Sequence, residues 1–158
     1  MKESSRGALF QGLVAGLIGY VVVAGFFVAL NLVMGRPATF TAGILGTALV
    51  GGAAAEVGAV IAFNGVHMLA SMVMGVGAAL LIYETELHPR AWFAFFFVFV
   101  AGFVFTSVVA GVVAAEMTEA APWWAVIFSN LLAAGLSVRY LLSRHPWLAA
   151  TVRDVAEA

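Results

Sequence analysis

One apolar stretch, Val57 to Tyr83, limits what this chain can fold into. It is long enough to cross a bilayer, which takes about 20 mainly apolar residues. On a helix that turns about 100° per residue, its polar residues fall on one side. That side comprises Glu56, Asn64, His67, Ser71, Gly75 and Ala78. Because hydrocarbon offers no hydrogen-bond partner, we predict that this polar stripe faces other helices of a membrane bundle.

The composition excludes a soluble domain. Of 158 residues, 64% are hydrophobic and only 9% are charged, whereas a soluble domain carries about 25% charged residues. A net charge of −1 lacks the excess of positive charge that is typical of nucleic-acid-binding proteins. The chain has no cysteine, which excludes disulfides, thiolate metal sites and cysteine nucleophiles. We expect a single membrane domain over residues 1–158.

The apolar runs predict an all-α membrane protein with four transmembrane helices in a bundle. A short re-entrant or interfacial helix is expected between spans 1 and 2, because that apolar run is too short to cross. A helix lying on the cytoplasmic surface is expected near the C-terminus. The spans cover about 8–34, 57–83, 91–115 and 123–142, and the two interfacial pieces cover about 42–55 and 147–156.

Loop charge favours four spans over a five-span alternative in which residues 41–62 and 65–85 cross separately. With four spans and a cytoplasmic N-terminus, only Arg36 lies on the outer side. The positive-inside rule asks for this asymmetry, so both termini are expected in the cytoplasm. The six remaining basic residues then lie inside: Lys2, Arg6, Arg90, Arg139, Arg144 and Arg153. All four tryptophans fall at predicted span ends, as an aromatic belt requires: Trp92, Trp123, Trp124 and Trp147.

Small residues indicate where helices pack closely. Gly12, Gly16 and Gly19 share one face of the first span with GxxxG spacing, which is typical of close helix crossings. Gly75 and Gly111 are the expected counterparts on the second and third spans. The alternative is the general enrichment of glycine in membrane helices.

A polar layer is predicted in the outer half of the membrane. At about 1.5 Å rise per residue, polar side chains of three spans reach similar depth. The candidate cluster is Asn64, His67, Ser71, Thr106, Ser107 and Asn130, with Ser129 beside it. His67 is the only titratable group well inside a predicted span, apart from Tyr20 near the middle of the first. Two interpretations stay open, namely interhelical hydrogen bonding and a binding or proton-handling site around His67.

No catalytic constellation is visible, so we expect a protein that is not an enzyme. The chain has no HExxH motif, and its carboxylates lie near span ends, so neither a metal site nor a Ser/His/Asp set is expected. No cofactor is expected. Haem ligation by two imidazoles remains an alternative, but His67 is the only intramembrane histidine, since His88 and His145 lie at the cytoplasmic edge.

Three stretches resemble a loose group of small bacterial four-span membrane proteins: Gly12–Arg36, Thr41–Leu49 and Phe63–Gly75. The resemblance implies the bacterial cytoplasmic (inner) membrane and brings no activity with it. The Asn-Gly-Val-His run from Asn64 is also similar to a turn in haem–copper oxidase subunit III, but Asn64 replaces that turn's first histidine.

Three functional hypotheses follow from these observations. The first is an accessory or structural subunit of a membrane complex, or a self-associating bundle, whose partners are the lipid bilayer and either other membrane subunits or further copies of this chain. The second is a small transporter or channel that uses the polar layer around His67. The third is a haem- or quinone-binding electron-transfer subunit.

Overall fold

The computed structural model describes residues 5–51, 56–87, 121–146 and 150, and every element in them is helical. Helix α1 covers Ser5–Val33, α2 Phe40–Val50, α3 Glu56–Leu87 and α5 Trp123–Arg144. The all-α prediction is confirmed for this part of the chain. The predicted span 91–115 and the predicted surface helix 147–156 lie outside the described residues, apart from residue 150.

Three of these helices are long and apolar enough to cross a membrane: Arg6–Val33, Glu56–Thr85 and Trp123–Arg144, with 28, 30 and 22 residues. Each exceeds the roughly 20 residues that a crossing needs. Most of their large apolar side chains are exposed, which suits helices surrounded by lipid. Because α3 runs unbroken from Glu56 to Leu87, the five-span alternative, which would divide it, does not form.

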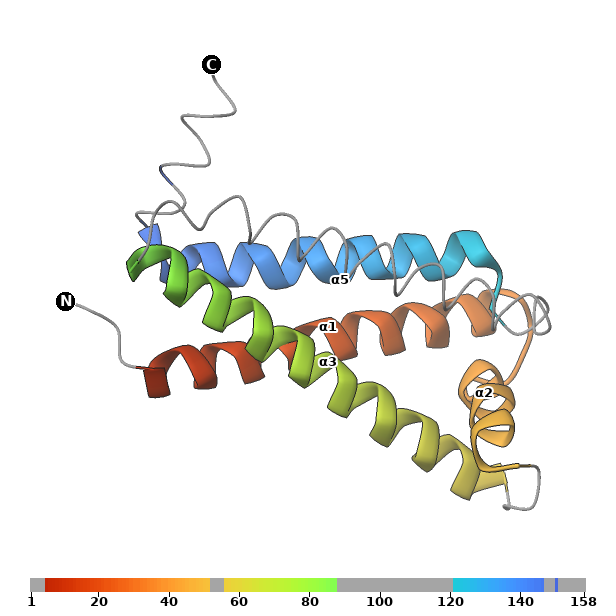
Figure 1. The fold of residues 1–158 in the computed structure, drawn as a ribbon. Coiled ribbons are helices and arrows are strands. Elements are labelled where there is room, and N and C mark those ends of the chain that lie inside the picture. Colours follow the sequence, from red (N-terminus) through yellow and green to blue (C-terminus); the bar gives the residue numbers. More distant parts are fainter. Residues whose placement is uncertain (1–4, 52–55, 88–120, 147–149, 151–158) are drawn as a thin grey trace.

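Helix α1 packs against both α5 and α3 and is antiparallel to both; α5 lies alongside it, whereas α3 crosses it obliquely (Figure 1). Gln11, near the start of α1, contacts His145, which follows the end of α5. At the other end, Asn31 of α1 and Val126 of α5 line one cavity. The start of α1 therefore lies at the same end of the bundle as the end of α5.

Glycines bring α1 and α3 into backbone contact where they cross. A Cβ added at Gly12 would overlap the backbone of Val76, and one at Gly16 would lie 2.5 Å from the Met72 Cα. A Cβ on Gly75 would overlap the Gly12 carbonyl and the Gly16 backbone. Only glycine permits this approach, because any side chain would force the helices apart. The predicted glycine Gly19 faces α5, where its Cβ would meet the Ser137 hydroxyl at 3.5 Å.

Beyond the crossing, α1 and α3 diverge, and α2 lies in the opening between them (Figure 1). Gly46 packs directly on the backbone of Ala59 in α3. Asn31, which is buried near the end of α1, accepts a hydrogen bond from the Thr41 hydroxyl (3.0 Å) and donates one to the Ala38 carbonyl (3.2 Å). With 11 residues, α2 is too short to cross; whether it is re-entrant or interfacial stays a prediction.

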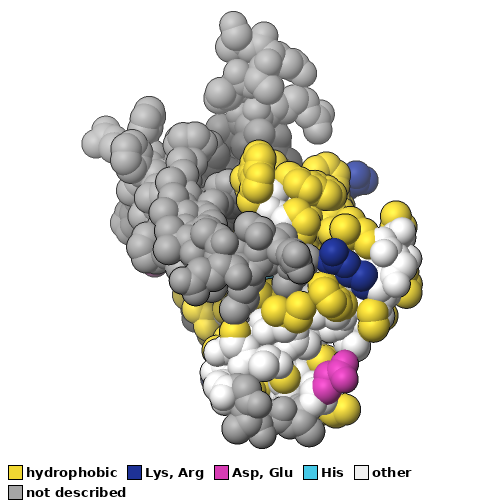
Figure 2. Space-filling model, turned by 90° about the vertical axis from the view of Figure 1, so that its right-hand side faces the viewer, with side chains coloured by type: hydrophobic (Ala, Val, Ile, Leu, Met, Phe, Trp, Pro, Cys, Tyr) yellow, Lys and Arg dark blue, Asp and Glu magenta, His cyan; other side chains and the backbone are white. Residues whose placement is uncertain are grey.

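Among the described residues, the end of the molecule that carries α2 has few charges. In Figure 2, hydrophobic side chains and uncharged atoms cover most of the described surface there, with small basic and acidic patches. Glu56 at the start of α3 is exposed. It therefore does not belong to the buried side of α3, although the helical periodicity places it there.

Candidate functional site

The divergence of α1 and α3 leaves a partly open cavity of about 360 Å³ beside the described helices. Its wall is mainly apolar and comes from α1, α2, α3 and the start of α5. Side chains such as Phe27, Leu45 and Val60 make up this apolar wall. The polar side chains among its described lining residues are few: Asn31, Thr39, Thr41, Asn64, His67 and Asn130.

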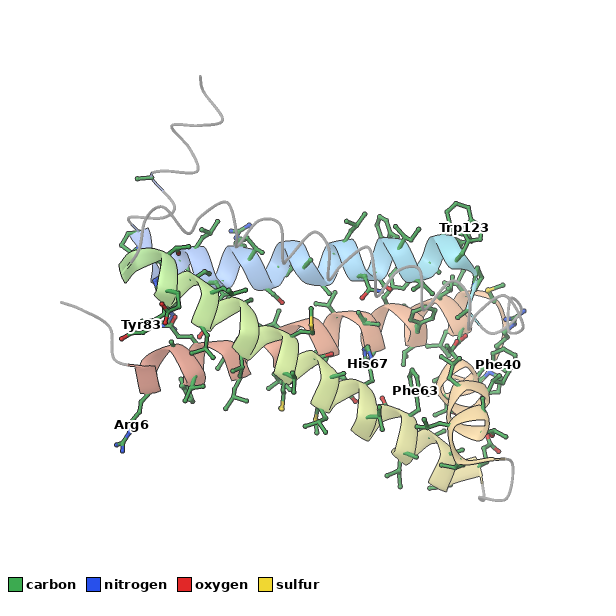
Figure 3. The ribbon with its side chains drawn as sticks, in the orientation of Figure 1. Arg6, Phe40, Phe63, His67, Tyr83 and Trp123 are labelled. Carbon is green, nitrogen blue, oxygen red and sulfur yellow. The ribbon has the colours of Figure 1, made fainter. Side chains whose placement is uncertain are left out.

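His67 projects from α3 toward α1, with Phe63 one turn away on the side of α2 (Figure 3). The imidazole stacks parallel to the Phe63 ring, with centroids 5.7 Å apart and 3° between the planes. Tyr20 of α1 packs against it at the same centroid distance with a tilt of 50°. These two aromatic neighbours fix the orientation of the imidazole ring. Within the described residues, its Nε2 atom is buried and has no hydrogen-bond partner.

Neighbouring polar groups are engaged elsewhere. The Tyr20 hydroxyl donates to the Asn64 side-chain oxygen at 3.0 Å and thereby joins α1 to α3. The Asn64 amide nitrogen donates to the Val60 carbonyl of its own helix at 2.8 Å. On α5, Asn130 donates to the Val126 carbonyl at 2.8 Å. With these bonds in place, Nε2 of His67 has no hydrogen-bond partner in the part of the chain that the structure describes.

A second cavity, of about 230 Å³, extends toward the end of α5. It shares three lining residues with the first cavity, namely Val23, His67 and Asn130. Its remaining wall consists largely of small residues of α1, α3 and α5, including Gly16 and Ser71. His67 and Asn130 therefore lie where the two cavities adjoin; we call this shared lining the waist and the two cavities the chambers. At the end of this cavity, four buried apolar side chains form a packed cluster, and two of them, Ala15 and Leu141, line the cavity: Ala15, Ala79, Ile82 and Leu141.

The structure brings together part of the predicted polar cluster. Asn64, His67 and Asn130 line the first cavity, and His67, Ser71 and Asn130 line the second. Ser129 is buried but bonds the Val126 carbonyl of its own helix at 3.1 Å. The predicted members Thr106 and Ser107, like the packing residue Gly111, lie outside the described residues.

Tyr20 belongs to this site and was missing from the predicted cluster. Its depth near the middle of the first span is the sequence feature that marks it. The partnership between Gln11 and His145 was also not foreseen. Their side chains lie 2.9 Å apart at the far end of the bundle, so His145 is remote from the chamber around His67.

Metal binding finds no support in the described part of the chain, where no group of three or more His, Asp or Glu residues is placed to hold an ion. Comparisons with models of known protein families, with curated proteins and with solved structures found no match for this chain. The function must therefore be argued from the geometry of the cavity.

Proposed function

We propose that this chain is a non-enzymatic, multi-pass membrane protein that binds a small, mainly apolar molecule in the cavity beside His67. The observation that supports this proposal is the cavity itself, with its volume of about 360 Å³ and its apolar wall. Small-molecule sites typically measure about 300–1,000 Å³ and place a few polar groups in an apolar lining.

The unpaired nitrogen of His67 favours binding over a purely structural role. About 90% or more of buried polar groups in proteins have a hydrogen-bond partner. A histidine kept for interhelical bonding would be expected to have one. Nε2 of His67 has none within the described residues, so a partner supplied by a ligand accounts for the arrangement.

We place the protein in the bacterial cytoplasmic membrane with both termini in the cytoplasm. Basic residues support this orientation, because Arg6 and Arg144 lie at the end of the bundle where Gln11 contacts His145. Arg36 follows α1 at the opposite end. The positive-inside rule then assigns the Arg6 end to the cytoplasm.

Filling the cavity tests the proposal. Ala42 of α2 lines the cavity, whereas Ala48 of the same helix is exposed. Wild-type protein purified in lipid nanodiscs is expected to release a small molecule on solvent extraction, seen by mass spectrometry. Ala42→Phe should lose that molecule, and Ala48→Phe, which adds the same bulk outside the cavity, should retain it. Equal recovery of the molecule from both variants would refute the proposal.

An accessory or self-associating subunit is the second candidate. Gly25, Gly65 and Gly135 are exposed and have open space where a Cβ would stand, which suits close packing against another membrane helix. Purification in mild detergent tests it. Recovery of a defined partner subunit or a homo-oligomer, lost when these glycines are changed to leucine, is the expected result. A monodisperse single chain would exclude it.

A small carrier or channel is the third candidate. The observation in its favour is that two chambers meet at Val23, His67 and Asn130. If the chambers conduct, His67→Ala and Asn130→Ala should change solute flux in liposomes. Flux through the wild type that equals the flux of empty liposomes would exclude this candidate.

A further inference from the structure

The surroundings of His67 also indicate the chemistry of the bound molecule, an inference that rests on the function proposed above. A molecule dissolved in the bilayer gains little by moving its apolar part into an apolar cavity, because lipid tails are as apolar as the cavity wall. Binding from the membrane therefore depends on shape and on polar contacts. The relevant polar groups are those that the protein itself leaves unpaired.

His67 is the group that meets this requirement. Its ring is held by Phe63 and Tyr20, and its buried Nε2 lacks a partner within the described residues. Tyr20 and Asn64 bond each other, and the second bond of Asn64 goes to its own helix. Neither of these neighbours forms a hydrogen bond with Nε2 of His67.

Asn130 adds a second group at the same place. It lines both cavities with His67, and its amide nitrogen is bonded to the Val126 carbonyl. This arrangement leaves the side-chain oxygen of Asn130 as the acceptor at the waist. A ligand at this position therefore faces two polar groups of the same wall, the ring nitrogen of His67 and the amide oxygen of Asn130.

The described part of the wall favours a neutral ligand. None of the described lining residues of either cavity is Lys, Arg, Asp or Glu. A charged group placed among these residues would lose its hydration without gaining a counter-ion from them.

We propose that the ligand is a neutral, lipid-soluble molecule whose carbonyl or hydroxyl oxygen hydrogen-bonds to Nε2 of His67 at the waist between the two chambers. A protonated Nε2 donates to a carbonyl, and an unprotonated Nε2 accepts from a hydroxyl. Quinones supply the first kind of oxygen, and long-chain or prenyl alcohols supply the second. The apolar remainder of the molecule occupies the chambers on either side.

Binding of three probes to the full-length protein in nanodiscs tests this proposal. Decylubiquinone carries ring carbonyls, farnesol carries a hydroxyl, and farnesane is the hydrocarbon counterpart of farnesol. At least one oxygen-bearing probe is expected to bind more tightly than farnesane and to shift the imidazole ¹⁵N resonance of His67. Tighter binding of decylubiquinone assigns the quinone class, and tighter binding of farnesol assigns the alcohol class.

Two phenylalanine variants give the matched comparison. His67→Phe keeps a flat ring but removes the nitrogen. It should lower the affinity for the oxygen-bearing probe about three- to tenfold, which corresponds to the net contribution of one hydrogen bond. Leu69→Phe, on an exposed part of α3, should leave the affinity unchanged. His67→Gln, which restores a donor and an acceptor, should recover part of the loss.

The outcomes separate this inference from the function on which it rests. If a probe binds and is excluded by Ala42→Phe but binds His67→Phe as well as wild type, the cavity binds ligands and the hydrogen-bond anchor is wrong. If all three probes bind equally in wild type and Ala42→Phe, both the anchor and the proposed function are overturned.

Discussion

The two halves of the α1–α3 pair differ in how closely the helices approach. In the half nearer the chain's start, Gly12, Gly16 and Gly75 allow backbone contact. In the other half, the helices diverge, α2 enters the gap, and the cavity beside His67 remains. The same two helices thus touch through their backbones at the crossing and leave the first cavity between them further along. The placement of small residues accounts for this difference.

Interhelical hydrogen bonds occur in both halves. Toward the start of α1, Ser137 donates to the Ala15 carbonyl at 2.9 Å, and Gln11 contacts His145. Beside the first cavity, the Tyr20 hydroxyl donates to Asn64 and joins α1 to α3. What distinguishes the cavity is Nε2 of His67, which is buried and bonds no described residue. That atom, rather than the hydrogen bonds between helices, favours a binding role for the cavity.

The largest effect is expected from adding a side chain at the crossing. Gly75→Leu would drive side-chain atoms into the Gly12 and Gly16 backbone, which cannot move aside, whereas Gly77 has open space around it. We expect Gly75→Leu to lower the free energy of unfolding by about 3 kcal/mol or more. Gly77→Leu should change it little. Thermal unfolding in detergent measures both, and equal melting temperatures would contradict a glycine-dependent crossing.

A smaller effect is expected where α2 packs on α3. A Cβ on Gly46 would overlap the Ala59 carbonyl, whereas one on Gly43 would make an ordinary contact with Val60 at 3.8 Å. Gly46→Ala should cost about 1–3 kcal/mol, and Gly43→Ala should be neutral or stabilising because alanine favours helix. Hydrogen exchange of the α2 amides should increase only in Gly46→Ala. Faster exchange in both variants would show that α2 is not held at Gly46.

The smallest effect concerns the chamber and differs in sign between two substitutions. Tyr20→Phe removes the bond to Asn64 and should lower the free energy of unfolding by about 0.6 kcal/mol, the average for an interhelical bond in membranes. His67→Phe removes an unpaired nitrogen and should raise it by about 1 kcal/mol. Both values refer to ligand-free protein in detergent. If His67→Phe lowered the free energy of unfolding as much as Tyr20→Phe does, the imidazole would already have a structural partner.

Hydrophobic length and periodicity predicted much of the described fold. They located three long apolar helices, and they placed Asn64, His67 and Ser71 on one side of α3, where the structure has them partly buried. They failed for Glu56, which periodicity assigns to the same side but which is exposed at the first residue of α3. Periodicity records the side of a helix but not where a second helix ends its contact.

Partnerships between helices were harder to predict. The Tyr20–Asn64 and Gln11–His145 pairs each depend on the crossing angle and on the relative shift of two helices. Neither quantity can be derived from one helix alone. Depth estimates gave Asn130 and His67 a similar depth, and both residues line the first cavity. They did not indicate that the amide nitrogen of Asn130 would bond its own helix.

The location of the glycine crossing gives α3 two arms of unequal length. At about 1.5 Å per residue, the part of α3 from Gly75 to Glu56 measures about 28 Å and the part from Gly75 to Leu87 about 18 Å. A tilt of about 5° at the crossing displaces Glu56 by about 2.5 Å and Leu87 by about 1.6 Å. A small tilt of α3 about its crossing with α1 would therefore move the Glu56 end of α3 further than the other end. Such a tilt would change the separation of α1 and α3 beside the first cavity.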